Sequence, residues 1–154
     1  MASREQDITA LFERAREDLT RIEAGYQESL RAQRIDAALR ISVKSIFEHL
    51  RAALDYLAKD IHERHCGPIP KDKRFYFPIL PDRATFERRM EEWFPGLRDG
   101  APALWEYLES VQPYHDAHAW LGQFNTVNNE NKHDHLIEQT RLETPEVRVD
   151  LAAG

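Results

Sequence analysis

Proline is distributed so unevenly that it divides the chain into two parts. All 8 prolines follow Cys66, and the part before Cys66 contains a single glycine, Gly25. Proline breaks the interior of a helix and glycine weakens it, so residues 1–66 can form long uninterrupted helices while the remainder must form shorter elements. The sequence therefore predicts a mainly helical fold that begins with long helices.

Apolar residues recur at steps of three and four in two successive stretches, which is the pattern of amphipathic helices. The first stripe runs from Ile8 to Leu30 and the second from Val43 to Ile61. Asp36 stands between them, and its short carboxylate can cap the start of the second helix. We therefore predict helices over 3–35 and 37–66 that pack as a long antiparallel hairpin.

The proline-rich stretch 67–81 predicts a loop over the bundle. Within it the aromatic sequence from Phe75 to Ile79 is expected to be extended, and it is the evident partner for a short strand at Val147 to Leu151. Residues 144–154 are accordingly expected to form a tail or a short strand.

Helix signals return in residues 82–143. A helix is expected to begin at Asp82 and to stop at Pro95 and Gly96, and Pro102 suits the first turn of another because its missing N–H needs no partner there. A last helix is expected over about 116–143. The whole prediction is an all-α fold, a single domain over 1–154, organised as a four- to five-helix up-down bundle with a minor β piece.

Composition narrows the classes of partner. Lys and Arg together number 21 against 27 for Asp and Glu, a net charge of -6, which argues against strong non-specific binding to nucleic acid. Cys66 is the single cysteine, so an intrachain disulfide is excluded and a reducing compartment is favoured. The opening residues lack the pattern of a signal peptide, and we find no apolar stretch of membrane-spanning length. We therefore expect a cytoplasmic protein without a membrane partner.

The stretch NTVNNENKHDHL, from Asn125 to Leu136, places polar residues where the last helix should bury apolar ones. The core-facing stripe continues through Leu121, Phe124, Asn128, Asn131 and His135. Asparagine is a poor helix former, so one interpretation is a solvated, fraying helix end. The other is a polar island that faces buried polar partners or a cavity, because apolar residues return at Leu136.

Arg51 and Asp55 on the second helix are the candidate partners of this island. They lie four residues apart beside the apolar stripe, and they form either a surface ion pair or a charged pair that reaches the amides of another helix. We expect Asn131 to face Arg51 and Asp55, largely buried, with His133 beside them at the mouth of a cleft.

Three segments in order, LRAALDYLA, FPIL and NNENKHDHL, resemble a group of uncharacterised bacterial helical proteins. Those proteins carry a Leu-Arg-x-x-Leu-Asp-x-Leu-Ala segment and a later Asn-x-Asp/Asn-Lys-His segment, and the resemblance covers roughly residues 40 to 137. It implies a shared polar cluster, to which the helical stripe adds Asn128. The predicted ligand-binding cluster consists of Arg51, Asp55, Asn128, Asn129, Asn131, Lys132 and His133.

More loosely, the chain resembles the HEPN superfamily of helical bundles. Many of these are dimeric ribonucleases or nucleotide-handling toxins with an Arg-x4-6-His motif. Every histidine here lacks an arginine at that distance, and the nearest match, Asn128 to His133, has no fixed positive charge in place of the arginine. The resemblance with this departure implies a non-catalytic binding or regulatory module, associated with defence or toxin–antitoxin systems, for a small ligand, a nucleotide or a protein partner.

The alternative is a metal-independent ribonuclease or nucleotide-processing enzyme. In it His133 would be the general acid/base, and Arg51 and Lys132 would hold phosphate.

Metal sites are disfavoured. Glu130 and His133 have the spacing of a di-iron bundle, but the chain contains no second Glu-x-x-His pair. The end of the second helix carries three potential zinc ligands, His62, His65 and Cys66, but these suit capping of that helix better. Beside Pro113 there are two more histidines, His115 and His118, which are too few to form a zinc site. We expect neither a metal nor a cofactor.

The length of the first hairpin predicts self-association. A 30-residue helix is about 45 Å long, so the hairpin should overhang the shorter later helices and leave part of its apolar stripe uncovered. We therefore expect a homodimer through the first two helices.

Overall fold

A computed structural model of the chain describes residues 3–71 and 74–133, with side chains as far as Glu130. The described part is all-α, as predicted, and contains no strand. Its helices are α1 (Arg4–Ala32), α2 (Ala37–His65), α3 (Arg83–Trp93), α4 (Leu97–Gly100), α5 (Pro102–Ser110), the 3-10 helix η1 (Asp116–His118) and α6 (Ala119–His133). None of the described helices is both long and apolar enough to cross a membrane.

Local capping explains where the two long helices begin and end. Ser3 and Gln6 form a reciprocal capping box at the start of α1. Gln33 adopts a left-handed conformation (φ 51°) after α1, and the Arg34 N–H then donates to the Ser29 carbonyl over 3.1 Å. Asp36 accepts the Ala38 N–H over 3.2 Å and caps α2, as the sequence predicted.

The predicted hairpin of α1 and α2 is confirmed, and polar contacts fix its register. Near one end, Arg4 donates to Glu63 with Nη1 2.7 Å from Oε2, and this hydrogen bond lowers the pKa of Glu63. Farther along, the carboxylate of Asp18 is buried between the helices, where it accepts from Arg21 over 3.0 Å and from the Ser45 hydroxyl over 3.5 Å.

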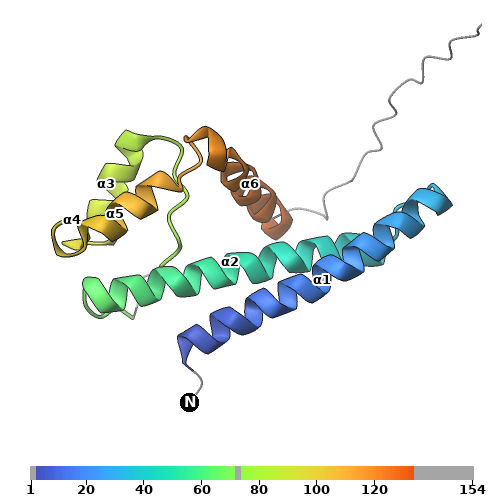
Figure 1. Cartoon of the computed structure of the whole chain (residues 1–154), viewed down its shortest axis with the longest axis horizontal. Helices are drawn as coiled ribbons and strands as arrows, with labels where there is room; N and C mark the ends of the chain where they lie inside the picture. The colour runs from blue at the N-terminus through green and yellow to red at the C-terminus, as the bar shows by residue number, and fades with distance from the viewer. Residues whose placement is uncertain (1–2, 72–73, 134–154) are drawn as a thin grey trace, which may run out of the picture.

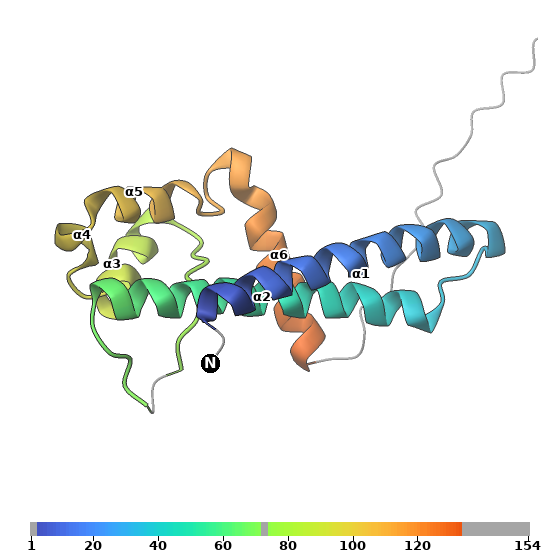
Figure 2. The same ribbon diagram turned by 60° about the horizontal axis from the view of Figure 1, so that its bottom comes forward.

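The later helices pack on one side of this hairpin (Figures 1 and 2). Helices α3, α4 and α5 gather near the C-terminal end of α2, and α6 lies against its middle, while the other end of the hairpin extends beyond them. Phe124 of α6 stacks on Phe47 of α2 with ring centroids 5.3 Å apart. Helix α2 therefore contacts α1 through one face and α6 through another.

The extended segment 74–81 passes between α2 and the short helices and forms the centre of the core. Phe75, Phe77 and Leu80 of this segment are buried against α3 and α5. Residues 75–79 are extended as predicted but are not paired as a strand with any described residue. The expected partner strand, 147–151, lies outside the described residues, as do the tail 144–154 and the predicted continuation of the last helix beyond residue 133.

Residues in the first turn determine where the shorter helices α3 and α5 begin, as expected. Asp82 accepts the Thr85 N–H over 2.8 Å and begins α3, which ends at Trp93 before Pro95. Pro102 begins α5. The additional element is α4, a single turn entered through Gly96 in a left-handed conformation (φ 78°), which brings the described α-helices to six where four to five were expected.

Candidate functional site

Arg51 and Asp55 join α2, α6 and the extended segment. The Arg51 guanidinium, which is buried, donates from Nη1 to Asn125 Oδ1 on α6 over 3.2 Å and from Nη2 to the Phe77 carbonyl over 3.2 Å. It also pairs with Asp55, with Nη2 3.1 Å from Oδ1. The charged pair is thus partly buried and reaches an amide of another helix. This agrees with the second interpretation given above and not with a surface ion pair.

Asp55 completes the contact with the extended segment. Its Oδ1 accepts the Phe77 N–H over 2.8 Å, so both backbone groups of Phe77 bond to the pair. The ring of Tyr76 lies 5.8 Å from the Arg51 Cζ, within cation–π range. We call Arg51, Asp55 and Asn125 the Arg51 cluster.

Among the described side chains, the asparagine that reaches Arg51 is Asn125. Since Phe124 stacks on Phe47, the next residue of α6 falls beside Arg51, one turn farther along α2. The predicted contact of Asn131 lies outside the described side chains, as do the positions of the Lys132 and His133 side chains. Sequence reasoning missed Asn125, although it opens the asparagine stretch directly after a buried aromatic residue.

The rest of the asparagine stretch divides between the core and the surface. Leu121, Phe124 and Asn128 are buried, which confirms the predicted course of the stripe as far as Asn128. Asn128 is only 1% exposed, and neither its Oδ1 nor its Nδ2 has a hydrogen-bond partner among the described residues. Asn129 is exposed and does not join the Arg51 cluster.

An open groove of 670 Å³ lies beside the Arg51 cluster. Its polar lining comes from Gln123, Asn125 and Thr126 of α6, and the facing wall is apolar: Ile79, Leu80, Pro81 and Pro113. The remaining lining residues are Ala119, Gly122 and Val127, so the groove lining carries no ionisable side chain. Asn125 belongs to both features, because its side chain bonds Arg51 and also lines the groove.

Gln112 fixes the wall of this groove, and sequence reasoning gave no indication of it. The side chain is fully buried after α5. Its Oε1 accepts the Leu80 N–H over 2.9 Å, and its Nε2 donates to the carbonyls of Pro78 and Leu108 over 3.2 and 2.8 Å. The extended segment is therefore held at two places, by Arg51 and Asp55 and by Gln112.

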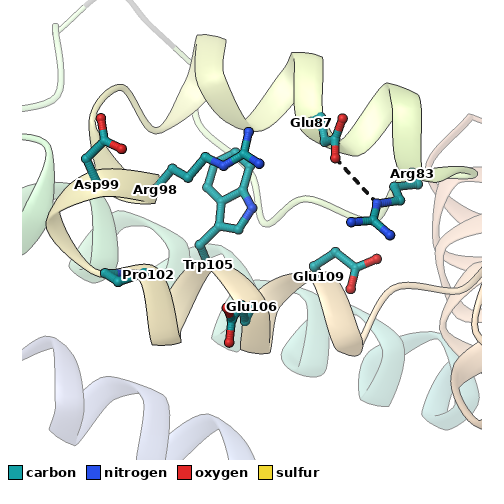
Figure 3. Close-up of a pocket in the computed structure, with 8 residues that line it drawn as sticks. All are labelled: Arg83, Glu87, Arg98, Asp99, Pro102, Trp105, Glu106 and Glu109. Atoms are coloured by element: carbon teal, nitrogen blue, oxygen red, sulfur yellow. Dashed lines mark hydrogen bonds and ion pairs between the residues drawn. The ribbon is translucent and has the colours of Figure 1, made fainter.

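A second pocket, of 370 Å³, lies between α3, α4 and α5 (Figure 3). Two arginines face four carboxylates there, and the lining residues are Arg83, Glu87, Arg98, Asp99, Pro102, Trp105, Glu106 and Glu109. The Arg83 Nε donates to Glu87 over 3.4 Å, and the Arg98 guanidinium lies 5.5 Å from the Trp105 ring centroid. Both arginines already have acidic partners, Arg83 in Glu87 and Arg98 in Glu91, so this pocket is the weaker candidate.

Glu109 also connects this pocket to the turn before η1. Its Oε1 accepts the Tyr114 hydroxyl over 2.8 Å and lies 3.1 Å from His115 Nε2. Burial and then this bond to Glu109 raise the pKa of Tyr114 well above its usual range, so the phenol stays a hydrogen-bond donor even in alkaline solution.

At the end of α2, the histidine nearest the core makes contacts within the fold. His62 is buried, with Nδ1 2.9 Å from the Gly67 carbonyl and its ring 4.8 Å from that of Phe75, and this contact resembles the capping role that was predicted. Burial raises the pKa of the Cys66 thiol, which disfavours the reactive thiolate. Among the described side chains, those of residues 3–71 and 74–130, no three from His, Cys, Asp or Glu are placed to hold a metal ion.

Comparisons of the chain with protein-family models, with curated proteins and with solved structures found no match.

Proposed function

We propose that this chain is a non-catalytic helical binding or regulatory module, and that its ligand occupies the groove beside the Arg51 cluster. The observation that carries the proposal is the double role of Asn125, which lines the groove and is held by the buried Arg51. An amide fixed in this way is pre-organised, so less side-chain freedom is lost when a ligand binds. The proposal agrees with the HEPN-like resemblance and with the departure from the Arg-x4-6-His motif.

The lining of the groove indicates the class of ligand. Gln123 and Asn125 each provide a donor and an acceptor, and the facing wall of Ile79, Leu80 and Pro81 suits an apolar or planar surface. Because the lining has no cationic side chain, it offers nothing that would hold a phosphate strongly. The ligand that fits is a neutral group with a donor–acceptor edge, such as a nucleobase or a peptide amide.

Thermal shift with neutral nucleosides, the matching nucleoside monophosphates and N-acetylated amino acid amides tests this proposal. A binding compound at ten times its Kd should raise the Tm by about 3–6 °C, and a nucleoside should do so at least as well as its monophosphate. The Gln123→Ala variant should weaken the response, whereas Gln27→Ala, which removes an exposed amide on α1, should leave it unchanged.

Two results would contradict the proposal. The first is the absence of any response across these compounds at millimolar concentration. The second is a response that Gln123→Ala and Gln27→Ala reduce equally, because binding would then occur elsewhere.

The ribonuclease alternative gains less support from the geometry. Its phosphate-holding Arg51 already donates to Asp55, Asn125 and the Phe77 carbonyl. Incubation of RNA with the native chain and with His133→Ala distinguishes the two functions. Cleavage by the native chain alone would favour the enzyme and overturn the binding module, whereas equal cleavage by both would indicate contamination.

A further inference from the structure

Helix α1 carries a row of large apolar side chains that the described chain leaves half uncovered. Phe12, Leu19, Tyr26 and Leu30 are 46%, 48%, 51% and 49% exposed. The side of α1 that faces α2 is different and carries the buried Ala15, Asp18 and Ser29. Helix α1 therefore packs on α2 through one face and presents a second apolar row to solvent.

The spacing of this second row is that of a seam between two helices. Phe12, Leu19 and Tyr26 are seven residues apart, and Arg16 and Glu23 fall between them. With Leu30 they form the outer stripe of α1, in which successive members alternate by four and three residues: Phe12, Arg16, Leu19, Glu23, Tyr26 and Leu30. A regular alternation of this kind over nearly three heptads is typical of packing against another helix.

The area of the stripe fits a small specific interface. Half-exposed large side chains present roughly 100 Å² each, so the four apolar residues offer about 400 Å², as large as the whole apolar patch of a typical monomer. The aliphatic stems of Arg16 and Glu23 add to this area. Two copies of the stripe would together bury roughly 1,000 Å², which is at the low end of specific interfaces.

The two charges in the stripe identify the occupant. No ion pair joins Arg16 or Glu23 to another described residue, although the neighbouring Arg14 and Arg21 both pair with Asp18. Arg16 and Glu23 are about 10 Å apart along their own helix, too far to pair with each other. A partner stripe with the same two charges in reverse order would neutralise both.

A second copy of α1 in the antiparallel direction has this order. If the two copies are centred on Leu19, Phe12 lies opposite the partner's Tyr26. Arg16 then lies within one residue, about 1.5 Å along the axis, of the level of the partner's Glu23, close enough to form an ion pair. A parallel pairing would instead bring like charges together. We propose that the outer stripe of α1 is a homodimer interface in which two copies of α1 pack antiparallel about a two-fold axis at Leu19.

The mass of the full chain in solution is the first test. Sedimentation and light scattering at 1–100 µM (about the range of ordinary protein interfaces) should give twice the 18.0 kDa of one chain. Leu19→Glu should reduce the mass to that of one chain without loss of helicity, because Leu19 is half exposed in the single chain. A native chain that stays monomeric throughout, or binds only a different protein through this stripe, would overturn the proposal.

A charge exchange tests the direction of the pairing. Arg16→Glu and Glu23→Arg should each weaken dimerisation by about tenfold or more, because each places like charges opposite one another across the two-fold axis. The double variant Arg16→Glu/Glu23→Arg restores opposite charges and should return the Kd to within about threefold of the native value. If the double variant is as weak as the single variants combined, the two residues do not face each other.

Cysteine cross-linking gives a readout that does not depend on affinity. In a Cys66→Ser background, Leu19→Cys should form a disulfide between copies, because a residue on the two-fold axis meets its own copy. Glu5→Cys is the matched control, since it lies on the same stripe one heptad before Phe12. In the antiparallel dimer the two copies of this control position are about 40 Å apart and stay uncoupled. Cross-linking of both variants would indicate a parallel dimer, and cross-linking of neither would exclude the seam.

Discussion

Replacing Asp55 with alanine isolates the energetic role of the Arg51 cluster. The substitution leaves the Arg51 guanidinium without its counter-charge, although Asn125 and the Phe77 carbonyl remain in place. It also removes the acceptor of the Phe77 N–H. Two buried groups, one charged and one neutral, thus lose their partners through a single change.

The expected cost follows from the burial of the pair. Removing one member of a fully buried ion pair costs about 3–5 kcal/mol, and a stranded backbone N–H adds about 1–3 kcal/mol. The side chains of Arg51 and Asp55 retain 11% and 17% of their exposure, so water can reach both and the sum must be reduced. We expect about 3–4 kcal/mol, which corresponds to a fall in Tm of roughly 6–16 °C for a chain of this size.

Denaturation followed by circular dichroism measures this loss. The control is Asp60→Ala on the same helix, which removes ion pairs with Arg4 and Arg64 that water reaches more freely and should cost less than about 1 kcal/mol. The double variant Arg51→Met/Asp55→Leu should recover part of the loss because no charge is then stranded. If Asp55→Ala costs no more than Asp60→Ala, the Arg51 cluster does not hold the extended segment.

Three further outcomes are expected. Gln112→Leu should cost about 2–4 kcal/mol in chemical denaturation, because it strands the Leu80 N–H and the Pro78 carbonyl, and a cost below that of exposed Gln123→Leu would contradict the observed bonds. Hydrogen bonds from the Thr85 backbone N–H and hydroxyl lower the pKa of Asp82 below its ordinary 3.8. The stabilisation of the fold by this carboxylate is therefore complete above pH 3.8 and is lost as the pH falls through the lower folded-state pKa. Thermal unfolding from pH 6 to pH 2 (about the range over which carboxylates titrate) should therefore show a smaller acid loss for Asp82→Ser, which keeps a cap that does not titrate; an equal loss would exclude this cap as a source. Asn128→Leu should raise the Tm by roughly 2–8 °C, because it removes from an apolar stripe a buried amide that has no hydrogen-bond partner among the described residues, and a fall in Tm would mean that this amide has a partner elsewhere in the chain.

The sequence predicted those parts of the fold that depend on local chemistry. Asp36 and Asp82 cap the helices that follow them, and Pro102 begins a helix, because each of these effects involves residues within one turn. The single turn of α4 was missed because four residues are too few for a periodic pattern. Its existence depends on Gly96 and on the burial of Leu97 in the core.

Only part of the candidate site could be predicted from the sequence. Arg51 and Asp55 were identified, whereas Asn125, the amide that contacts Arg51 among the described side chains, was not. The stripe pattern specifies which residues face inward, and it correctly placed Asn128 there. It cannot specify how far α6 slides along α2, because the stacking of Phe124 on Phe47 sets that distance. The role of Gln112 could not be predicted for a similar reason, because two of its three hydrogen bonds depend on where the extended segment passes.

The position of α2 makes the two proposed interactions separable. Ser45 and His49 point toward α1, with His49 Nδ1 3.2 Å from Asp18 Oδ2, whereas Phe47 and Arg51 contact α6 on another face. The outer stripe of α1 and the groove beside the Arg51 cluster are therefore on different helices, with α2 between them. A rigid helix pair can transmit a change only if its packing has two alternative arrangements, and the buried carboxylate of Asp18, bonded to both helices, favours one. Leu19→Glu should accordingly abolish dimerisation without changing the response of the groove to its ligand, and Gln123→Ala should weaken that response without changing the mass.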